Sequence, residues 1–187
     1  MIELGMIRDI VTIFGVIAGF SYYVMTVRNS QRIQKMQLET RQAGLFMQLF
    51  SIYDTKEFLE DFGKIAYHVE YEDLADWESK YGPLTELSSY SSWVRVGRFF
   101  DGVGILVKKE LIDAYLVTEL LRELVINSWE SMRAWVTEIR EIMGTPEVWE
   151  NFEYLYGEVR KRHPDMITLD DTMIKLKEMV GSEQGLN

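Results

Sequence analysis

The feature that most constrains this chain is an uncharged, apolar segment of eighteen residues, Ile10–Val27. As an α-helix this segment would be about 27 Å long, close to the thickness of the hydrocarbon core of a bilayer. Nine of its residues are Ile, Val or Phe, and each of these favours insertion into lipid by about 0.3 to 0.6 kcal/mol. The next longest uncharged run, Gln42–Tyr53, is too short to span. We therefore expect one transmembrane helix, over residues 10–27.

Two other structures are compatible with an apolar segment of this kind. A cleaved signal peptide has a basic start and small residues at its cleavage site, whereas this chain has Glu3 and Asp9 before the segment and Tyr-Tyr-Val-Met near its end. A core helix of a soluble bundle is the second alternative, but such a helix rarely runs for eighteen residues without a charged face. The sequence favours the membrane anchor.

Basic residues flank the apolar segment unequally. One precedes it and four follow it, at Arg8 and at Arg28, Arg32, Lys35 and Arg41. Because the more basic flank stays in the cytoplasm, we expect a single-pass protein of the cell membrane with its C-terminal part in the cytoplasm and residues 1–9 as a short stub outside. Arg28 and Arg32 are expected to contact anionic lipid headgroups, at about 1 kcal/mol each.

The rest of the chain has the pattern of an all-α protein. Its apolar residues recur at helical spacing, and its three prolines fall between these repeats, where helices end. We predict a juxtamembrane stalk helix over residues 28–53, a cytoplasmic helical bundle over 54–181 and a disordered tail over 182–187. Within the bundle the expected helices are Thr55–Glu70, Glu72–Lys80, Ser88–Lys109, Asp113–Met143, Thr145–Arg162 and a last one that ends near Val180.

Three local patterns define these helices further. Thr55 is expected to cap the helix that buries Phe58, Phe62, Ile65 and Val69. In Gly144-Thr145-Pro146-Glu147, the glycine should end one helix, and Thr145 should cap the next with Pro146 at its first position. The longest helix of the bundle is expected to face the core with Val117, Leu120, Leu121, Leu124, Trp135, Ile139 and Ile142.

Composition and spacing argue against several functions. The chain has no cysteine, which excludes disulfides, thiolate metal sites and cysteine nucleophiles. Its net charge of −10 disfavours a nucleic-acid partner. The two histidines, His68 and His163, lack the glutamate three residues earlier that a di-metal helical bundle requires. We therefore expect no metal, no cofactor and no enzymatic activity.

Three further patterns are better explained by packing than by catalysis. Gly102-x-Gly104 lacks the third glycine and the preceding strand of a dinucleotide-binding loop, so a helix kink or a close helix crossing is expected there. Arg95, Arg98 and Asp101 are expected to form a structural polar cluster, in which Arg98 pairs with Asp101 if these side chains are partly buried. The five tryptophans are expected in the core.

A predicted dimer seam follows the first helix. Gly15 and Gly19, four residues apart, let two transmembrane helices approach closely. A stripe with a period of 3.5 residues, typical of paired helices, continues from these glycines into the stalk through Asn29, Ile33, Met36, Met47 and Phe50. This stripe predicts a parallel homodimer. In the alternative interpretation, Met36–Phe50 packs on later helices of the same chain.

Several stretches resemble those of a known family. They are FFDGVGILVKKELIDAYLV (Phe99–Val117), a tryptophan in the following helix (Trp129) and FEYLYGEVRKR (Phe152–Arg162), together with the N-terminal span and the basic stalk. In these features the chain resembles an uncharacterised prokaryotic family, domain of unknown function 4760, over most of its length. The resemblance implies no activity.

These patterns predict a membrane-tethered helical module that binds a protein partner or forms a subunit of a membrane-associated assembly. The expected partners are the lipid bilayer, an unidentified protein and a second copy of the chain. Two alternatives stay open. One is a membrane-associated enzyme of unknown reaction, and the other is a soluble helical bundle with the first helix in its core.

Overall fold

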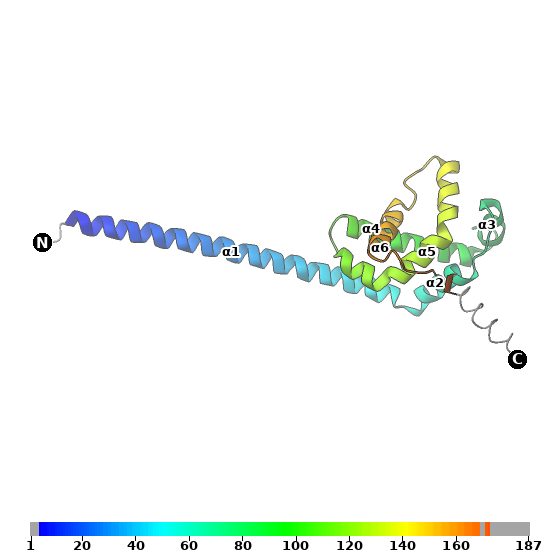
Figure 1. The fold of residues 1–187 in the computed structure, drawn as a ribbon, viewed down its shortest axis with the longest axis horizontal. Coiled ribbons are helices and arrows are strands. Elements are labelled where there is room, and N and C mark those ends of the chain that lie inside the picture. The colour runs from blue at the N-terminus through cyan, green and yellow to red at the C-terminus, as the bar shows by residue number, and fades with distance from the viewer. Residues whose placement is uncertain (1–3, 169–170, 173–187) are drawn as a thin grey trace. The chain divides into compact units, whose positions relative to one another are not determined.

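The computed structural model describes residues 4–168 and 171–172 of the chain. These residues form six α-helices and contain no β-strand (Figure 1), which confirms the predicted all-α class. The chain divides into two compact units, Met1–Gly44 and Leu45–Asn187. Residues 1–3 of the predicted stub, the helix expected to end near Val180 and the predicted tail over 182–187 lie outside the described residues.

The first unit consists of most of helix α1, which runs from Leu4 to Tyr53 (blue to cyan in Figure 1). With a rise of 1.5 Å per residue, a helix of 50 residues is about 75 Å long. Neither a proline nor a break in hydrogen bonding interrupts it. The prediction that one helix continues from the apolar segment to Tyr53 is therefore confirmed.

The second unit is a helical bundle that begins with the last turns of α1. Leu45, Phe46, Leu49 and Tyr53 pack there against the core. The other helices are α2 (Lys56–His68), α3 (Leu74–Tyr81), α4 (Leu87–Lys108), α5 (Ala114–Met143) and α6 (Glu150–Arg162).

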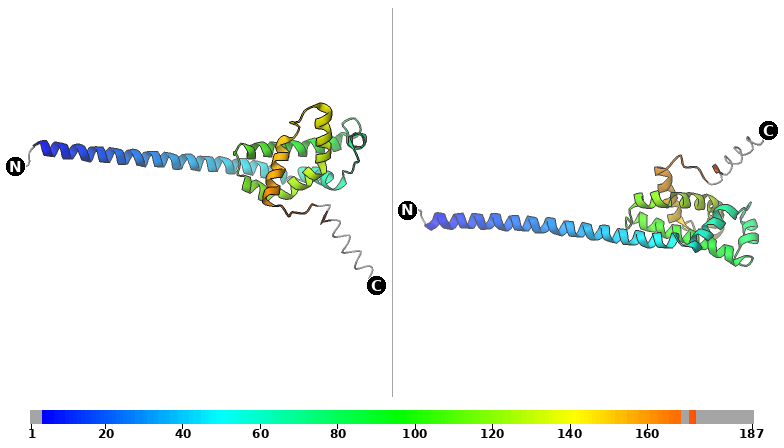
Figure 2. Two further views of the ribbon diagram at one scale, coloured as in Figure 1. Left: turned by 45° about the horizontal axis from the view of Figure 1, so that its top comes forward. Right: turned by 90° about the horizontal axis from the view of Figure 1, so that it is seen from below.

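Helix α4 is central to the bundle, since it contacts α2, α3, α5 and α6. Figure 2 shows α6 (orange) next to α4 (green), which it contacts. The buried side chains of α4 recur every three or four residues, as expected for a helix with one face in the core, at Trp93, Val96, Phe100, Val103 and Val107.

Local capping defines most helix ends. The Thr55 hydroxyl accepts a hydrogen bond from the Phe58 N–H at 3.2 Å, and Asp73 caps α3 in the same way through the Asp76 N–H at 2.8 Å. Gly144 ends α5 in the left-handed conformation, with φ at 63°, which a glycine adopts without strain. The predicted cap at Thr55 and the predicted end at Gly144 are confirmed.

The buried face of α5 differs from the predicted one. Val117 and Leu121 are buried as expected, but Leu120 is 39% exposed and Ile142 is 70% exposed. The fully buried stripe steps by four or three residues from Leu121 through Val125, Trp129, Met132 and Val136. Leu120 and Ile142 were wrongly placed because they lie beside this stripe rather than on it.

The start of α6 is a second correction. Thr145 does not cap α6, because residues 145–149 form turns in which the Val148 N–H donates to the Thr145 carbonyl. The helix begins only at Glu150, after Trp149 has adopted a left-handed conformation with φ at 51°. Trp149 lies against Gly97 of α4, and this contact explains why the chain turns before the helix begins.

Candidate functional site

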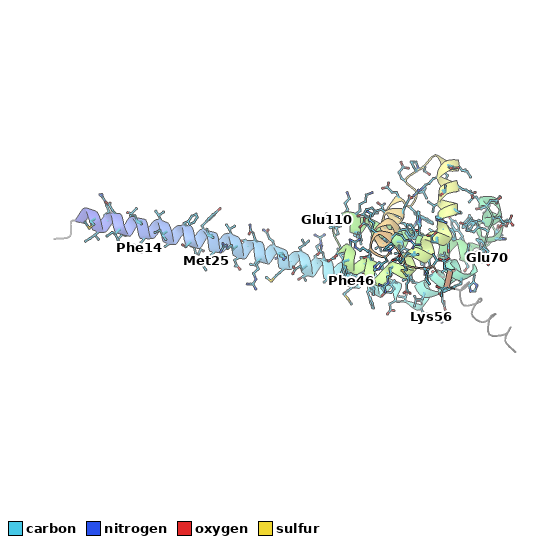
Figure 3. All side chains as sticks on the ribbon, viewed as in Figure 1. Phe14, Met25, Phe46, Lys56, Glu70 and Glu110 are labelled. Carbon is cyan, nitrogen blue, oxygen red and sulfur yellow. The ribbon has the colours of Figure 1, made fainter. Side chains whose placement is uncertain are left out.

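The apolar segment of α1 is exposed along its whole length. From Ile10 to Val27 every residue except the partly buried Val24 is exposed. Among the described residues α1 is the one helix that is long and apolar enough to cross a membrane, and its apolar window is not buried at all. Phe14 and Met25 project away from the helix into open space (Figure 3). By length, composition and exposure, α1 is therefore a candidate membrane span.

Two threonine hydroxyls in this segment donate hydrogen bonds to backbone carbonyls of the same helix. The Thr12 hydroxyl donates to the Arg8 carbonyl at 2.9 Å, and the Thr26 hydroxyl donates to the Tyr22 carbonyl at 2.9 Å. In lipid an unpaired hydroxyl would be unfavourable, whereas a hydroxyl bonded to the preceding turn is tolerated. These threonines are therefore compatible with a membrane environment.

The predicted dimer seam lies on the open surface of α1. A Cβ atom added at Gly15 or Gly19 would have no other atom within 4 Å. Asn29, Ile33 and Met36 are exposed, so the first unit leaves this stripe uncovered. In the second unit Met47 is exposed, whereas Phe50 is partly buried and packs edge-to-face on Tyr53 at 5.1 Å. The seam is therefore open at each of these residues except Phe50, and the dimer itself stays a prediction.

The predicted lipid-contact residues directly follow the apolar segment. The side chains of Arg28 and Arg32 are both exposed. The next basic side chain, Lys35, lies 3.8 Å from Glu39. The first positive charges after Val27 are thus accessible, and their contact with lipid stays a prediction.

Asp101 connects α4 to the start of α6. Its Oδ1 atom accepts hydrogen bonds from the backbone N–H groups of Asn151 at 3.0 Å and Phe152 at 3.1 Å. The residue before α6, Trp149, makes no side-chain capping bond. Because the first N–H groups of a helix have no partner within it, Asp101 supplies the cap from another helix.

The predicted polar cluster on α4 is therefore arranged differently. Arg98 is exposed, so the burial on which its predicted pairing with Asp101 depended is not met, and no ion pair joins the two in the described part of the chain. Arg95 instead lies 3.0 Å from Asp61 of α2. Asp61 also accepts a hydrogen bond from the Ser92 hydroxyl at 2.6 Å. The cluster joins α4 to α2 and α6 rather than forming along one helix.

Close approach of α6 depends on two glycines of α4. A Cβ atom at Gly104 would lie 2.0 Å from the Asn151 carbonyl oxygen, and one at Gly97 would lie 2.3 Å from the Trp149 ring. At Gly102 no atom would lie within 4 Å. A close crossing is thus confirmed at Gly104 but not at Gly102. Gly97 was missed, although its separation of seven residues from Gly104 places both on one face.

The tryptophans are predominantly core residues, as predicted. Trp77, Trp93 and Trp129 are buried, whereas Trp135 and Trp149 are partly buried and pack against the core. Trp77 lies 5.2 Å from Trp93 and 5.4 Å from Trp135, measured between ring centroids. The indole nitrogens of Trp77, Trp93 and Trp135 are buried without a hydrogen-bond acceptor. Rings at these tilted angles can interact through N–H and π faces.

A polar cluster between α5 and α6 consists of Tyr156, Glu130 and Arg160. The Tyr156 hydroxyl donates to Glu130 Oε1 at 2.6 Å, and Arg160 lies 3.3 Å from the same oxygen. Burial, followed by the bond to Glu130, raises the pKa of Tyr156.

No group of three or more metal-ligating side chains occurs in the described residues. Of the two histidines, His68 is exposed, and His163 lies 3.1 Å from Glu119.

Comparison with known proteins identifies a family. The family model described as "Domain of unknown function (DUF4760)" matches residues 9–159. This match includes the apolar segment, the stalk and all but the end of α6, and it confirms the resemblance seen in the sequence. Neither a curated protein nor a solved structure matches the chain.

Proposed function

We propose that this chain, which belongs to the DUF4760 family, is a membrane-tethered helical module. In this proposal α1 crosses the cell membrane once through Ile10–Val27. The helical unit that follows lies in the cytoplasm, where it binds a protein partner or forms a subunit of a membrane-associated assembly.

The observation that carries the proposal is the exposure of Ile10–Val27, of which only Val24 is partly buried. An apolar helix buried in a protein core would be covered by other helices, and this one is not. Summed over its Ile, Val and Phe residues, transfer into lipid is favourable by about 4 kcal/mol. A bilayer would cover this surface, and the excess of basic residues after Val27 favours the orientation with the bundle inside.

Extraction of membranes with alkaline carbonate tests the anchor. We expect the full-length chain to stay with the membranes, and a chain that begins at Ser30 to be released. Ile17→Asp should lower the membrane-bound fraction, because an aspartate at the centre of a span opposes insertion by about 2.5 to 3.5 kcal/mol. The matched control is Leu38→Asp, since Leu38 is also exposed on α1 but lies beyond the apolar segment and off the dimer seam. Release of the full-length chain would favour the soluble bundle instead.

A reporter enzyme that is active only outside the cytoplasm tests the orientation. Fused after Asn187, it should stay inactive, whereas the same reporter fused before Met1 should be active. The opposite pattern would contradict the proposed topology.

Disulfide cross-linking in membranes tests the homodimer. The chain has no native cysteine, so single substitutions give unambiguous products. Cross-linking should be strongest at Ile33→Cys and Met36→Cys and weakest at Gln34→Cys and Lys35→Cys, which lie off the seam.

A second substitution checks that the glycines guide this pairing. Gly19→Leu should reduce cross-linking at Met36→Cys, because it adds bulk where two helices would approach. Ala18→Leu adds a side chain in the same turn but off the seam, and it should have little effect. Equal yields at all four cysteine positions would contradict the homodimer.

A further inference from the structure

A cavity of about 660 Å³ opens between α3 and the last turns of α5. Its volume lies within the range of small-molecule sites. Three aromatic side chains contribute to its lining, namely Trp77, Tyr90 and Trp135. Trp77 connects the other two, with ring centroids 6.3 Å from Tyr90 and 5.4 Å from Trp135. The cavity therefore borders the aromatic core, and packing within this core fixes the positions of the three rings.

The charged side chains that line the cavity are all acidic. They are Asp73, Glu78 and Glu138, and no Lys, Arg or His side chain contributes to the lining. Glu138 is held at the start of α3, where its Oε2 atom accepts a hydrogen bond from the Leu74 N–H at 2.9 Å. None of the three carboxylates forms an ion pair within the described residues.

Basic side chains on the same two helices are engaged elsewhere. Lys80 of α3 lies 2.8 Å from Asp76, and Arg140 of α5 lies 2.8 Å from Glu153. The negative charge of the cavity is therefore not neutralised by either of these neighbours. A positively charged ligand would supply the missing countercharge.

The aromatic rings that line the cavity also favour a cation. Trp77 is buried, whereas Tyr90 and Trp135 are partly exposed, so these two side chains offer ring surface to a ligand. Ring faces attract cations. Ile142 and Met143 line the cavity and are exposed, so they can contact an apolar part of the ligand.

We propose that this cavity binds an organic cation with an apolar body, such as an alkylated or arylated ammonium. The carboxylates of Glu78 and Glu138 attract the charge, the rings of Tyr90 and Trp135 contact the ammonium, and the aliphatic side chains contact the apolar body. This site is independent of the membrane anchor and of dimer formation.

Titration of the full-length chain in a nonionic detergent tests the proposal, with tryptophan fluorescence as the readout. Benzyltrimethylammonium, choline and 3,3-dimethyl-1-butanol are suitable probes, because the last two differ mainly in charge. We expect benzyltrimethylammonium to bind most tightly, and choline to bind about tenfold more tightly than the uncharged alcohol. Equal binding of choline and the alcohol would overturn the proposal.

Matched variants assign the binding to this cavity. Glu138→Gln keeps an acceptor for the Leu74 N–H and removes the charge, and it should weaken benzyltrimethylammonium binding about five- to tenfold. Glu78→Gln changes an exposed side chain, so it provides a second test that leaves the fold intact. Glu141→Gln, on the same helix and outside the lining, is the control and should change the affinity less than about twofold. Equal effects of Glu138→Gln and Glu141→Gln would overturn the site.

Discussion

Asp101 performs the capping that the local sequence predicted for Thr145. Its carboxylate accepts bonds from two N–H groups at the start of α6, although it lies 50 and 51 residues earlier in the chain. A carboxylate near a helix N-terminus also interacts favourably with the helix dipole. No spacing rule relates residues this far apart, so sequence analysis placed Asp101 beside Arg98 instead.

Replacement of Asp101 measures the strength of this cap. Asp101→Ala should lower the free energy of unfolding by about 1 to 2 kcal/mol, measured by urea unfolding of the detergent-solubilised chain. Asp101→Asn should have a smaller effect, since the amide oxygen still accepts. Arg98→Ala is the control and should change stability by less than about 0.5 kcal/mol. Losses of equal size at Arg98 and Asp101 would instead indicate an ion pair between them.

Two glycines of α4 provide a second comparison at the residue scale. Gly104→Ala should destabilise the chain by about 1 to 3 kcal/mol, because the new Cβ atom would clash with the Asn151 carbonyl. Gly102→Ala should stabilise it by about 0.5 to 1 kcal/mol, since space is free there and alanine favours a helix. Thermal unfolding of both variants separates these effects. A stabilised Gly104→Ala variant would show that α6 does not approach α4 closely there.

At the scale of helices, the sequence predicted those elements whose determinants are local. Thr55 caps α2, and the uninterrupted run to Tyr53 forms α1, as composition and spacing indicated. The start of α6 depends instead on Trp149, which lies on Gly97 and packs at a tilt against Trp135, with ring centroids 5.1 Å apart. A tertiary contact therefore overrode the local Thr-Pro pattern at this helix.

Ion pairs in the last turn of α6 make the free energy of unfolding of the chain dependent on pH. Hydrogen bonds from Lys161 at 2.6 Å and then from Arg162 at 2.9 Å hold the pKa of Glu158 below its ordinary value. A carboxyl with a lower pKa in the folded chain stabilises the fold fully above the unfolded pKa, about 4.3 for a glutamate. This contribution disappears as the pH falls through the folded pKa.

Glu158→Gln should therefore destabilise the chain at pH 7 by no more than about 1 kcal/mol, because these ion pairs are close to solvent. The difference from the unsubstituted chain should shrink below about pH 4, as measured by urea unfolding at both pH values. Glu147→Gln, in the exposed turn before α6, should change stability little at either pH. A difference for Glu158→Gln that persisted at low pH would contradict an ionic origin.

At the scale of the whole molecule, the all-α class and the candidate span were predictable because they depend on composition and local periodicity. The cavity was not. Its lining joins Trp77 and Glu78 of α3 with Trp135 and Glu138 of α5, and only the packing of these helices brings the four residues together. The sequence predicts the two tryptophans as core residues, and nothing in it indicates that they share a site with the two glutamates.

The two units predict where the chain can be divided. A chain that begins at Leu45 should fold into a helical domain, because it retains Leu45, Phe46, Leu49 and Tyr53 against the core. A chain that begins at Thr55 lacks these side chains and should be less stable by about 2 to 4 kcal/mol, given their partial burial. Circular dichroism with urea unfolding compares the two. Equal stabilities would show that the last turns of α1 contribute nothing to the core.

The cap supplied by Asp101 also has a consequence for the order of folding. Helix α6 has thirteen residues and no side-chain cap of its own, and isolated helices of this length are marginal in water. We therefore expect α6 to form after α4, when Asp101 is already in position to accept its first N–H groups. Contacts that form after the transition state affect mainly the unfolding rate. Asp101→Ala should accordingly accelerate unfolding in stopped-flow experiments and leave the folding rate nearly unchanged.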